Sequence, residues 1–194
     1  SSISLTRNFL WLAMWSMSPR NASRNDRMVH MSRMMICPGC GLNLPSADEQ
    51  LDERYNASYV CRQLSGELAA YTLSLGDADF IHQLVVDTYA AQHAGANIKP
   101  IAITFALVGL YLTFEHNYTG KQVQKAHTLL AGTPKTWPQF SMPEEKASLT
   151  VLDVLKTSEN ERNDMLREWG KAVWGIWEAE HTKVAELVHE RLHV

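Results

Sequence analysis

Two cysteines near the N-terminus have the spacing of a metal-binding turn. Cys37 and Cys40 lie in the sequence Cys-Pro-Gly-Cys-Gly, with two residues between them. A tight turn of this kind can present both sulfurs to one ion, as in structural zinc sites. A redox-active dithiol uses the same spacing, but it usually follows a strand and opens a helix in a βαβ unit, and that pattern is missing here. The pair therefore favours half of a zinc site, with thiol redox chemistry as the alternative.

A second group of polar side chains lies in the stretch 81–93, Ile-His-Gln-Leu-Val-Val-Asp-Thr-Tyr-Ala-Ala-Gln-His. Apolar residues recur in it at helical spacing, so we expect an amphipathic helix. This helix carries more hydrogen-bonding and metal-binding groups than packing in a core needs. These groups are His82, Asp87, Tyr89, Gln92 and His93.

Helical periodicity runs through most of the chain after an irregular stretch at 36–56. The expected helices are 57–75, 81–95, 101–116 and 119–132, followed by a loop at 133–140. Capping signatures of the Ser-x-x-Glu type predict a short helix from Ser141 and a long last helix from Ser158. The sequence therefore predicts an all-α helical bundle of five to six helices with an N-terminal CxxC zinc knuckle, in a single domain over residues 35–194.

Chain reversal between the first two helices predicts which side chains meet. The turn lies near Gly76, so Cys61 should lie level with residues 91–93 of the next helix. Cys61 and His93 would then share one end of the bundle, where the cysteine knuckle enters. Three thiolates and one imidazole form a closed ligand set typical of structural zinc. The alternative is that Cys61 is an ordinary buried cysteine of the core.

The other histidines could form a second metal site at the opposite end of the bundle. His82 precedes His93 by eleven residues, about 16 Å along a helix, so the two cannot bind the same ion. Two carboxylate-x-x-His pairs, Asp79 with His82 and Glu178 with His181, have a spacing found in di-iron bundles. The candidate residues for the second site are His82, Asp87, Tyr89, Glu115, His116 and His181. Helices produce such spacings by chance, and hydrogen bonding within the core is the alternative role of these side chains.

Composition limits the classes of partner. The chain has 194 residues, is 45% hydrophobic and 20% charged, and carries a net charge of −3. It has no basic excess to neutralise phosphates, so we expect no nucleic acid partner. The apolar helix 101–116 is shorter than the roughly 20 residues of a membrane span, so we expect it to be buried within one chain or against a second copy. Three cysteines are too few for a secreted disulfide framework and favour the cytoplasm.

Residues 1–34 differ in composition from the rest of the chain. They hold five arginines against one acidic residue and are rich in Ser, Asn and Met. We expect a disordered leader or an over-extended gene start, with translation beginning at Met34 or Met35. An organellar transit peptide has a similar composition. A signal peptide fits less well, because no small-x-small cleavage site follows the apolar run 9–15.

These motifs together resemble a family of bacterial proteins classed as a domain of unknown function. The similar features are the Cys-Pro-x-Cys-Gly opening at Cys37, then Cys61, and the pattern His-x-Leu-x-Val-Asp-x-Tyr-x-x-Gln-His over 82–93. A Trp-Pro loop at Trp137 and a Trp-rich C-terminal helix with His181 are also similar, so the resemblance covers about residues 35–190. It implies a cytoplasmic bacterial protein without an established activity.

The patterns lead to one main functional prediction and two alternatives. We expect a zinc-binding protein with a structural ion, whose role is to bind a small molecule or a protein partner. The expected zinc ligands are Cys37, Cys40, Cys61 and His93. One alternative is a metal-dependent hydrolase or transferase with an open site at the His82 and His181 end. The other is a thiol redox protein that uses Cys37 and Cys40. A homo-oligomer is compatible with each of the three.

Overall fold

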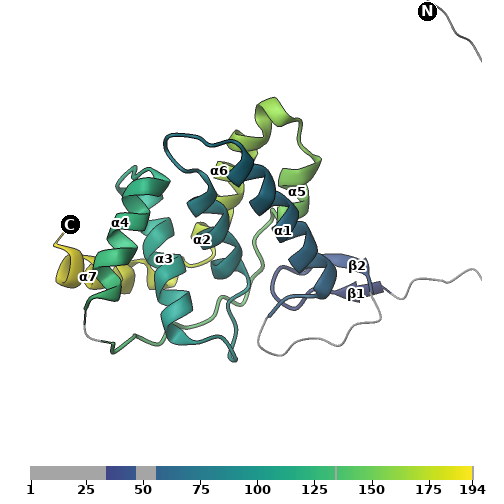
Figure 1. Cartoon of the computed structure of the whole chain (residues 1–194). Helices are drawn as coiled ribbons and strands as arrows, with labels where there is room; N and C mark the ends of the chain where they lie inside the picture. The colour runs from purple at the N-terminus through teal and green to yellow at the C-terminus, as the bar shows by residue number, and fades with distance from the viewer. Residues whose placement is uncertain (1–33, 47–55, 134, 194) are drawn as a thin grey trace, which may run out of the picture. The chain divides into compact units, whose positions relative to one another are not determined.

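The computed structural model describes residues 34–46, 56–133 and 135–193, which fold as a helical bundle with a short two-stranded sheet (Figure 1). The strands are β1 (Met34–Ile36) and β2 (Asn43–Pro45). The helices are α1 (Tyr59–Ser74), α2 (His82–Gln92), α3 (Pro100–Glu115), α4 (Gly120–Ala131), α5 (Val151–Lys156), α6 (Glu159–Gly175), the 3-10 turn η1 (Glu178–Glu180) and α7 (His181–Leu192). The predicted bundle is confirmed, with seven α-helices in these residues instead of five to six.

A β-hairpin surrounds the two cysteines of the knuckle. β1 and β2 pair antiparallel, with Met34 opposite Pro45 and Ile36 opposite Asn43. We predicted an irregular stretch here, because strands of three residues leave too little alternation to recognise in the sequence. Residues 47–55 of that stretch lie outside the described part of the chain, and so does the predicted leader apart from Met34.

The first four helices begin and end close to their predicted bounds, because local residues determine their ends. Ser58 precedes α1, and its Oγ accepts a hydrogen bond from the backbone N of Cys61 at 3.3 Å. Pro100 occupies the first turn of α3, where a backbone N–H would have no acceptor within the helix, so proline loses no hydrogen bond there. Thr119 forms a capping box with Gln122 at the start of α4.

The C-terminal third departs from the prediction in two places. No helix follows Ser141, whose backbone N donates to Glu180 Oε1 at 3.0 Å, and the short helix α5 begins only after Thr150. The expected single last helix is two helices, α6 and α7, separated by η1. Gly175, a poor helix former, ends α6, and the bond from Ser141 holds the buried Glu180 carboxylate in the 3-10 turn.

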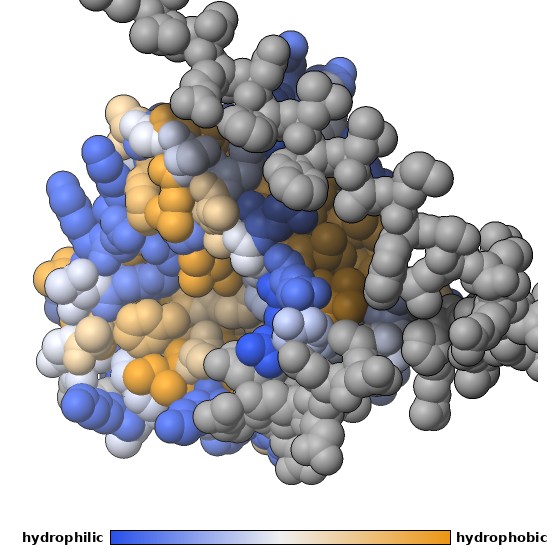
Figure 2. Space-filling model, turned by 45° about the vertical axis from the view of Figure 1, so that its right-hand side comes forward, coloured by the Kyte–Doolittle hydropathy of each residue, from blue (hydrophilic) through white to orange (hydrophobic). Residues whose placement is uncertain are grey.

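Helix α2 packs against α1, α3, α4 and α6 and so lies inside the bundle (Figure 1). Half of the residues of α3 are buried too, and α2, α4, α6 and α7 of the same chain cover them. These residues therefore belong to the core of one chain. Hydrophobic residues also reach the surface between hydrophilic ones on the face shown in Figure 2. Among the described helices, none is both long enough and apolar enough to cross a membrane.

Candidate metal centre

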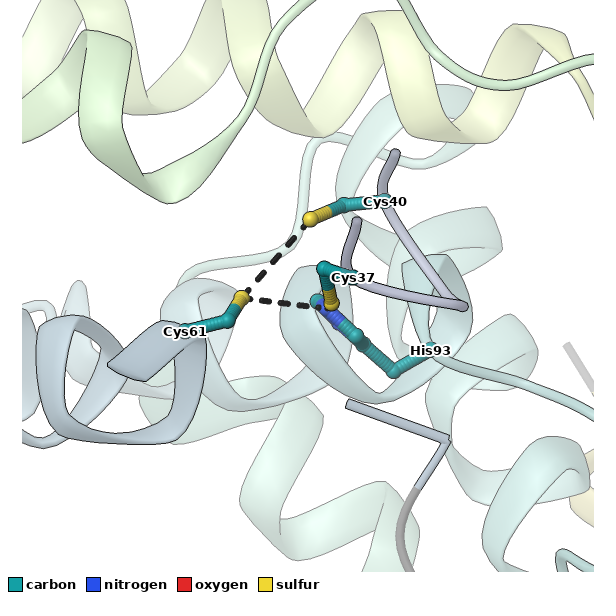
Figure 3. A group of neighbouring side chains, drawn as sticks. All are labelled: Cys37, Cys40, Cys61 and His93. Carbon is teal, nitrogen blue, oxygen red and sulfur yellow. Dashed lines mark hydrogen bonds between the residues drawn. The ribbon is translucent and has the colours of Figure 1, made fainter. Parts of the chain in front are cut away.

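Three thiols and one imidazole lie together in a buried cluster (Figure 3). Cys37 and Cys40 come from the turn between β1 and β2, Cys61 from the first turn of α1, and His93 from the end of α2. Their exposed fractions are 0%, 4%, 0% and 5%. Within the described residues, no other group of three or more candidate ligands has its donor atoms within 4.8 Å of one another. The four side chains could therefore hold a metal ion.

The distances between the donor atoms suit a tetrahedral ion. His93 Nε2 lies 3.5 Å from Cys37 Sγ and 3.3 Å from Cys61 Sγ. Cys40 Sγ lies 3.7 Å from Cys61 Sγ. Zinc bonds of about 2.3 Å to sulfur and about 2.0 Å to nitrogen place tetrahedral ligands about 3.8 Å apart for two sulfurs and about 3.5 Å apart for sulfur and nitrogen. Little movement is needed for these atoms to enclose one ion.

The knuckle has the backbone of a tight turn. Cys37 N donates to Leu42 O at 2.8 Å, and Gly41 N donates to Cys37 O at 2.9 Å. Gly41 has a φ of +80°, which favours glycine. A Cβ on Gly39 would lie 2.4 Å from Cδ2 of His93, so only glycine lets the turn approach the imidazole this closely. Both glycines of the Cys-Pro-Gly-Cys-Gly sequence are therefore needed to bring the cysteines to His93.

The start of α1 delivers Cys61 to the cluster. The backbone N of Ser58 donates to Cys37 Sγ at 3.4 Å, while the side chain of Ser58 caps the helix at Cys61. One residue thus ties the knuckle to the helix. Cys61 lies in the first turn, where the positive end of the helix dipole stabilises a thiolate. Sequence reasoning did not single out Ser58, although a serine three residues before a cysteine at a helix start is a recognisable cap.

His93 is oriented by the backbone of its own helix. Its Nδ1 lies 2.9 Å from Tyr89 O, so Nδ1–H donates to that carbonyl and Nε2 is left to face the sulfurs. The Tyr89 ring stacks on the imidazole with centroids 4.0 Å apart, and the Tyr89 hydroxyl donates to Cys61 Sγ at 3.8 Å. Tyr89, which we predicted for the second site, therefore braces this cluster instead.

Hydrogen bonds among the thiols shift their pKa values in opposite directions. The bond from Cys40, then that from Cys61, lowers the pKa of Cys37 far below its usual range. The bond to Cys37 raises the pKa of Cys40 to about 11, and bonds to both other cysteines raise the pKa of Cys61 further. These directions favour protons on Cys40 and Cys61 over a proton on Cys37. A metal ion would displace these protons, because thiolate is the ligand form.

Further contacts attach the cluster to the rest of the fold. Lys146 Nζ donates to Pro38 O at 2.8 Å, which ties the knuckle to the segment before α5. Gln92 Nε2 donates to Leu149 O at 2.7 Å, and Gln92 Oε1 accepts from Trp169 Nε1 at 3.1 Å. Gln92 lies next to His93, so these bonds fix the end of α2. The sequence contains no signal for the Lys146 contact, which joins residues 108 apart.

The histidines of the predicted second site have other partners. His82 Nδ1 lies 2.9 Å from Thr72 Oγ1 on α1, and burial lowers the pKa of this imidazole. His181 stacks on the indole of Trp174 with centroids 3.7 Å apart, and its Nε2 donates to Trp174 O at 3.0 Å. His116 Nε2 lies 3.1 Å from the Tyr111 hydroxyl. Each imidazole is thus engaged locally.

The two acids predicted for that site are also engaged. Glu115 Oε1 accepts from Trp174 Nε1 at 2.8 Å. Asp87 is buried, and both of its oxygens accept from Gln83 Nε2, at 3.0 and 3.1 Å. Burial raises the pKa of Asp87 well above its usual range. The structure does not bring these acids and the three histidines together into a ligand group among the residues it describes.

Comparison of the chain with known proteins tests the resemblance to a family of unknown function. A family of unknown function, DUF5946, matches residues 35–178, which include the knuckle, Cys61 and all of α2. No curated protein and no solved structure matches the chain. The match begins where the predicted leader ends and spans more than half of the sequence. The chain therefore belongs to the DUF5946 family of unknown function.

Proposed function

We propose that this protein binds one structural zinc ion through Cys37, Cys40, Cys61 and His93, and that its role is to bind a ligand or a partner. The observation that carries the proposal is the buried, closed set of four donors at tetrahedral spacing. Thiolates with one imidazole suit zinc better than the hard cations, which prefer oxygen. Four protein ligands leave no open coordination position for a substrate, which favours a structural ion over a catalytic one.

Zinc would add direct bonds between segments that lie far apart in the chain. The strands of the N-terminal hairpin are three residues long, too short to be stable alone. Cys40 and Cys61 are separated by 21 residues and Cys37 and His93 by 56. One ion bound to all four would fix the hairpin against the start of α1 and the end of α2. Three reduced cysteines at such a site also favour the cytoplasm as the compartment.

Elemental analysis combined with thiol titration tests the proposal. We expect one zinc per purified chain and thiols that react with Ellman's reagent only after chelation in denaturant. A chain without metal, whose thiols react freely or form a Cys37–Cys40 disulfide, would support the redox alternative and overturn this proposal. A second tightly held metal per chain would support the enzyme alternative, for which no ligand set is assembled in the described residues.

A further inference from the structure

A cavity of about 580 Å³ opens between α1, α2 and the start of α3, beside the metal cluster. Its walls are mainly aliphatic, and the residues that form them include Ala69, Val85, Val86, Ala90, Ile101 and Ala102. Three of these are alanines, so the neighbouring side chains are too short to fill the space. Small-molecule sites have volumes of about 300–1,000 Å³ and mostly apolar linings. The cavity has the size and lining of a ligand site.

Polar groups gather at one end of this cavity. Helices α1 and α2 follow each other across the turn at Gly76, so Ala69 and Val85 lie toward that turn. The polar lining residues toward the other end are Asn56, His93, Asn97 and Lys99, and they lie beside the apolar Ala57, Ile98, Ile101 and Ala102. The cavity is therefore apolar near the α1–α2 turn, and its polar groups lie among apolar ones at the end near the metal cluster. A ligand that matches it has an apolar tail and a polar head.

The charge that the described lining residues place at this end is positive. Among them, Lys99 is the one Lys, Arg, Asp or Glu side chain, and its ammonium has no hydrogen bond or ion pair with any described residue. It directly precedes Pro100, the first residue of α3, whose first turn contains no acidic residue. The positive end of the helix dipole therefore adds to the charge of Lys99. An anionic head group would be stabilised here.

We propose that this cavity binds a small amphipathic anion, an aliphatic chain that ends in a single carboxylate. The proposal rests on the ligand-binding role proposed above and specifies the class of ligand. The tail lies against the aliphatic walls of α1 and α2, and the carboxylate pairs with Lys99 at the start of α3. Tyr89 and His93 line the same cavity, so the metal cluster holds one of its walls in place. A concave site of this kind suits a small molecule better than a flat protein surface.

Calorimetric titration of the zinc-loaded full chain with octanoate and with 1-octanol tests this proposal. We expect octanoate to bind saturably at one molecule per chain and about tenfold more tightly than the neutral alcohol. Lys99→Gln should reduce octanoate affinity to that of 1-octanol and leave the alcohol unaffected. The matched control is Lys125→Gln on α4, which removes an exposed lysine that does not line the cavity and should change neither affinity.

A second pair of variants tests the walls. Ala69→Phe places a ring in the cavity and should abolish binding of both ligands, whereas Ala70→Phe adds the same ring at an exposed position of the same helix outside the lining and should not. The proposal is overturned if octanoate fails to saturate the zinc-loaded chain at about 1 mM, if octanol binds as tightly, or if both phenylalanine variants weaken binding equally.

Measuring zinc in every sample separates the two proposals. A wild-type chain that binds octanoate without holding zinc would overturn the structural-zinc proposal alone. A chain that holds one zinc but does not bind octanoate would overturn the ligand class alone. Zinc retention by Ala69→Phe would confirm that its loss of binding comes from the filled cavity and not from unfolding.

Discussion

His93 and His82 stand at opposite ends of α2 and have different surroundings. His93 Nε2 faces two sulfurs at 3.3 and 3.5 Å, with its other nitrogen bonded to a backbone carbonyl. His82 is bonded to the hydroxyl of Thr72, and no group of ligand side chains gathers around it among the described residues. A histidine on an inner helix thus becomes a candidate ligand only when other elements bring donors to it. At the His93 end, the knuckle and the start of α1 do so.

Removal of a metal ligand should give the largest difference between the His93 end and the His82 end of α2. Cys61→Ala removes one of four donors, so we expect zinc content to fall below one per chain and the free energy of unfolding to drop by at least about 3 kcal/mol. His82→Ala removes only a hydrogen bond to Thr72 and should leave zinc content unchanged. Elemental analysis and urea unfolding measure both. Equal zinc loss in the two variants would contradict the assignment of the ion to the His93 end.

A substitution at Gly39, where the knuckle approaches the end of α2, should have the next largest effect on stability. Gly39→Ala would place a Cβ 2.4 Å from His93 Cδ2 and 2.5 Å from Asn56 O, so the turn must shift. We expect a loss of about 2 kcal/mol in stability and weaker zinc binding in chelator competition. Gly66→Ala is the control, because nothing lies within 4 Å of its Cβ in α1 and it should stabilise the helix by about 0.5–1 kcal/mol. A Gly39→Ala protein as stable as wild type would show that the turn is not constrained by His93.

Asp87 lies on α2 between His82 and His93 and should make the free energy of unfolding depend on pH. Burial raises its pKa in the folded state, while the unfolded chain loses the proton near about pH 4. The folded state then holds more protons, so the free energy of unfolding falls as pH rises between the two pKa values, by up to about 1.4 kcal/mol per pH unit. Asp87→Asn resembles the protonated acid and should be more stable than wild type at about pH 8, with the difference shrinking toward about pH 5. Urea unfolding at the two pH values measures it, and a difference that does not change with pH would mean that Asp87 is ionised in the fold.

Removal of the Tyr89 hydroxyl, which contacts the metal cluster, should have the smallest effect on zinc affinity. Tyr89→Phe keeps the ring stacked on His93 and removes only the hydroxyl that donates to Cys61 Sγ. We expect zinc affinity to fall about threefold to tenfold, or about 1 kcal/mol, with little change in fold. Competition with a chromophoric chelator measures this change. Tyr111→Phe, which removes the hydroxyl near His116, is the matched control and should not alter zinc affinity. If both variants weaken zinc equally, the Tyr89 contact has no specific role.

Much of the fold and all four side chains of the metal cluster could be predicted, because they depend on local spacing and on the regular rise of the first two helices. The caps and breakers around α1 to α4 set the helix bounds, and the reversal near Gly76 brought Cys61 to within 3.3 Å of His93. The helix predicted after Ser141 is absent from the described structure, and the backbone N of Ser141 bonds instead to the distant Glu180, a contact that the local sequence does not show. The candidate side chains of the second site do not gather among the described residues, because the spacing of Asp79, which lies before α2, and His82 says nothing about what packs opposite. Bacterial origin, oligomeric state and the absence of a nucleic acid partner stay predictions.

The sequence by itself determined the cysteine turn, the periodicity of the helices and the register between the first two helices. Each of these depends on residues close in the chain or on the regular rise per residue of a helix. Tertiary structure alone decided that Tyr89 and Ser58 support the cluster, that His181 stacks on Trp174, and that alanines leave a cavity beside Lys99. These outcomes depend on which side chains meet across helices. The packing of all helices together determines that, and no single spacing contains it.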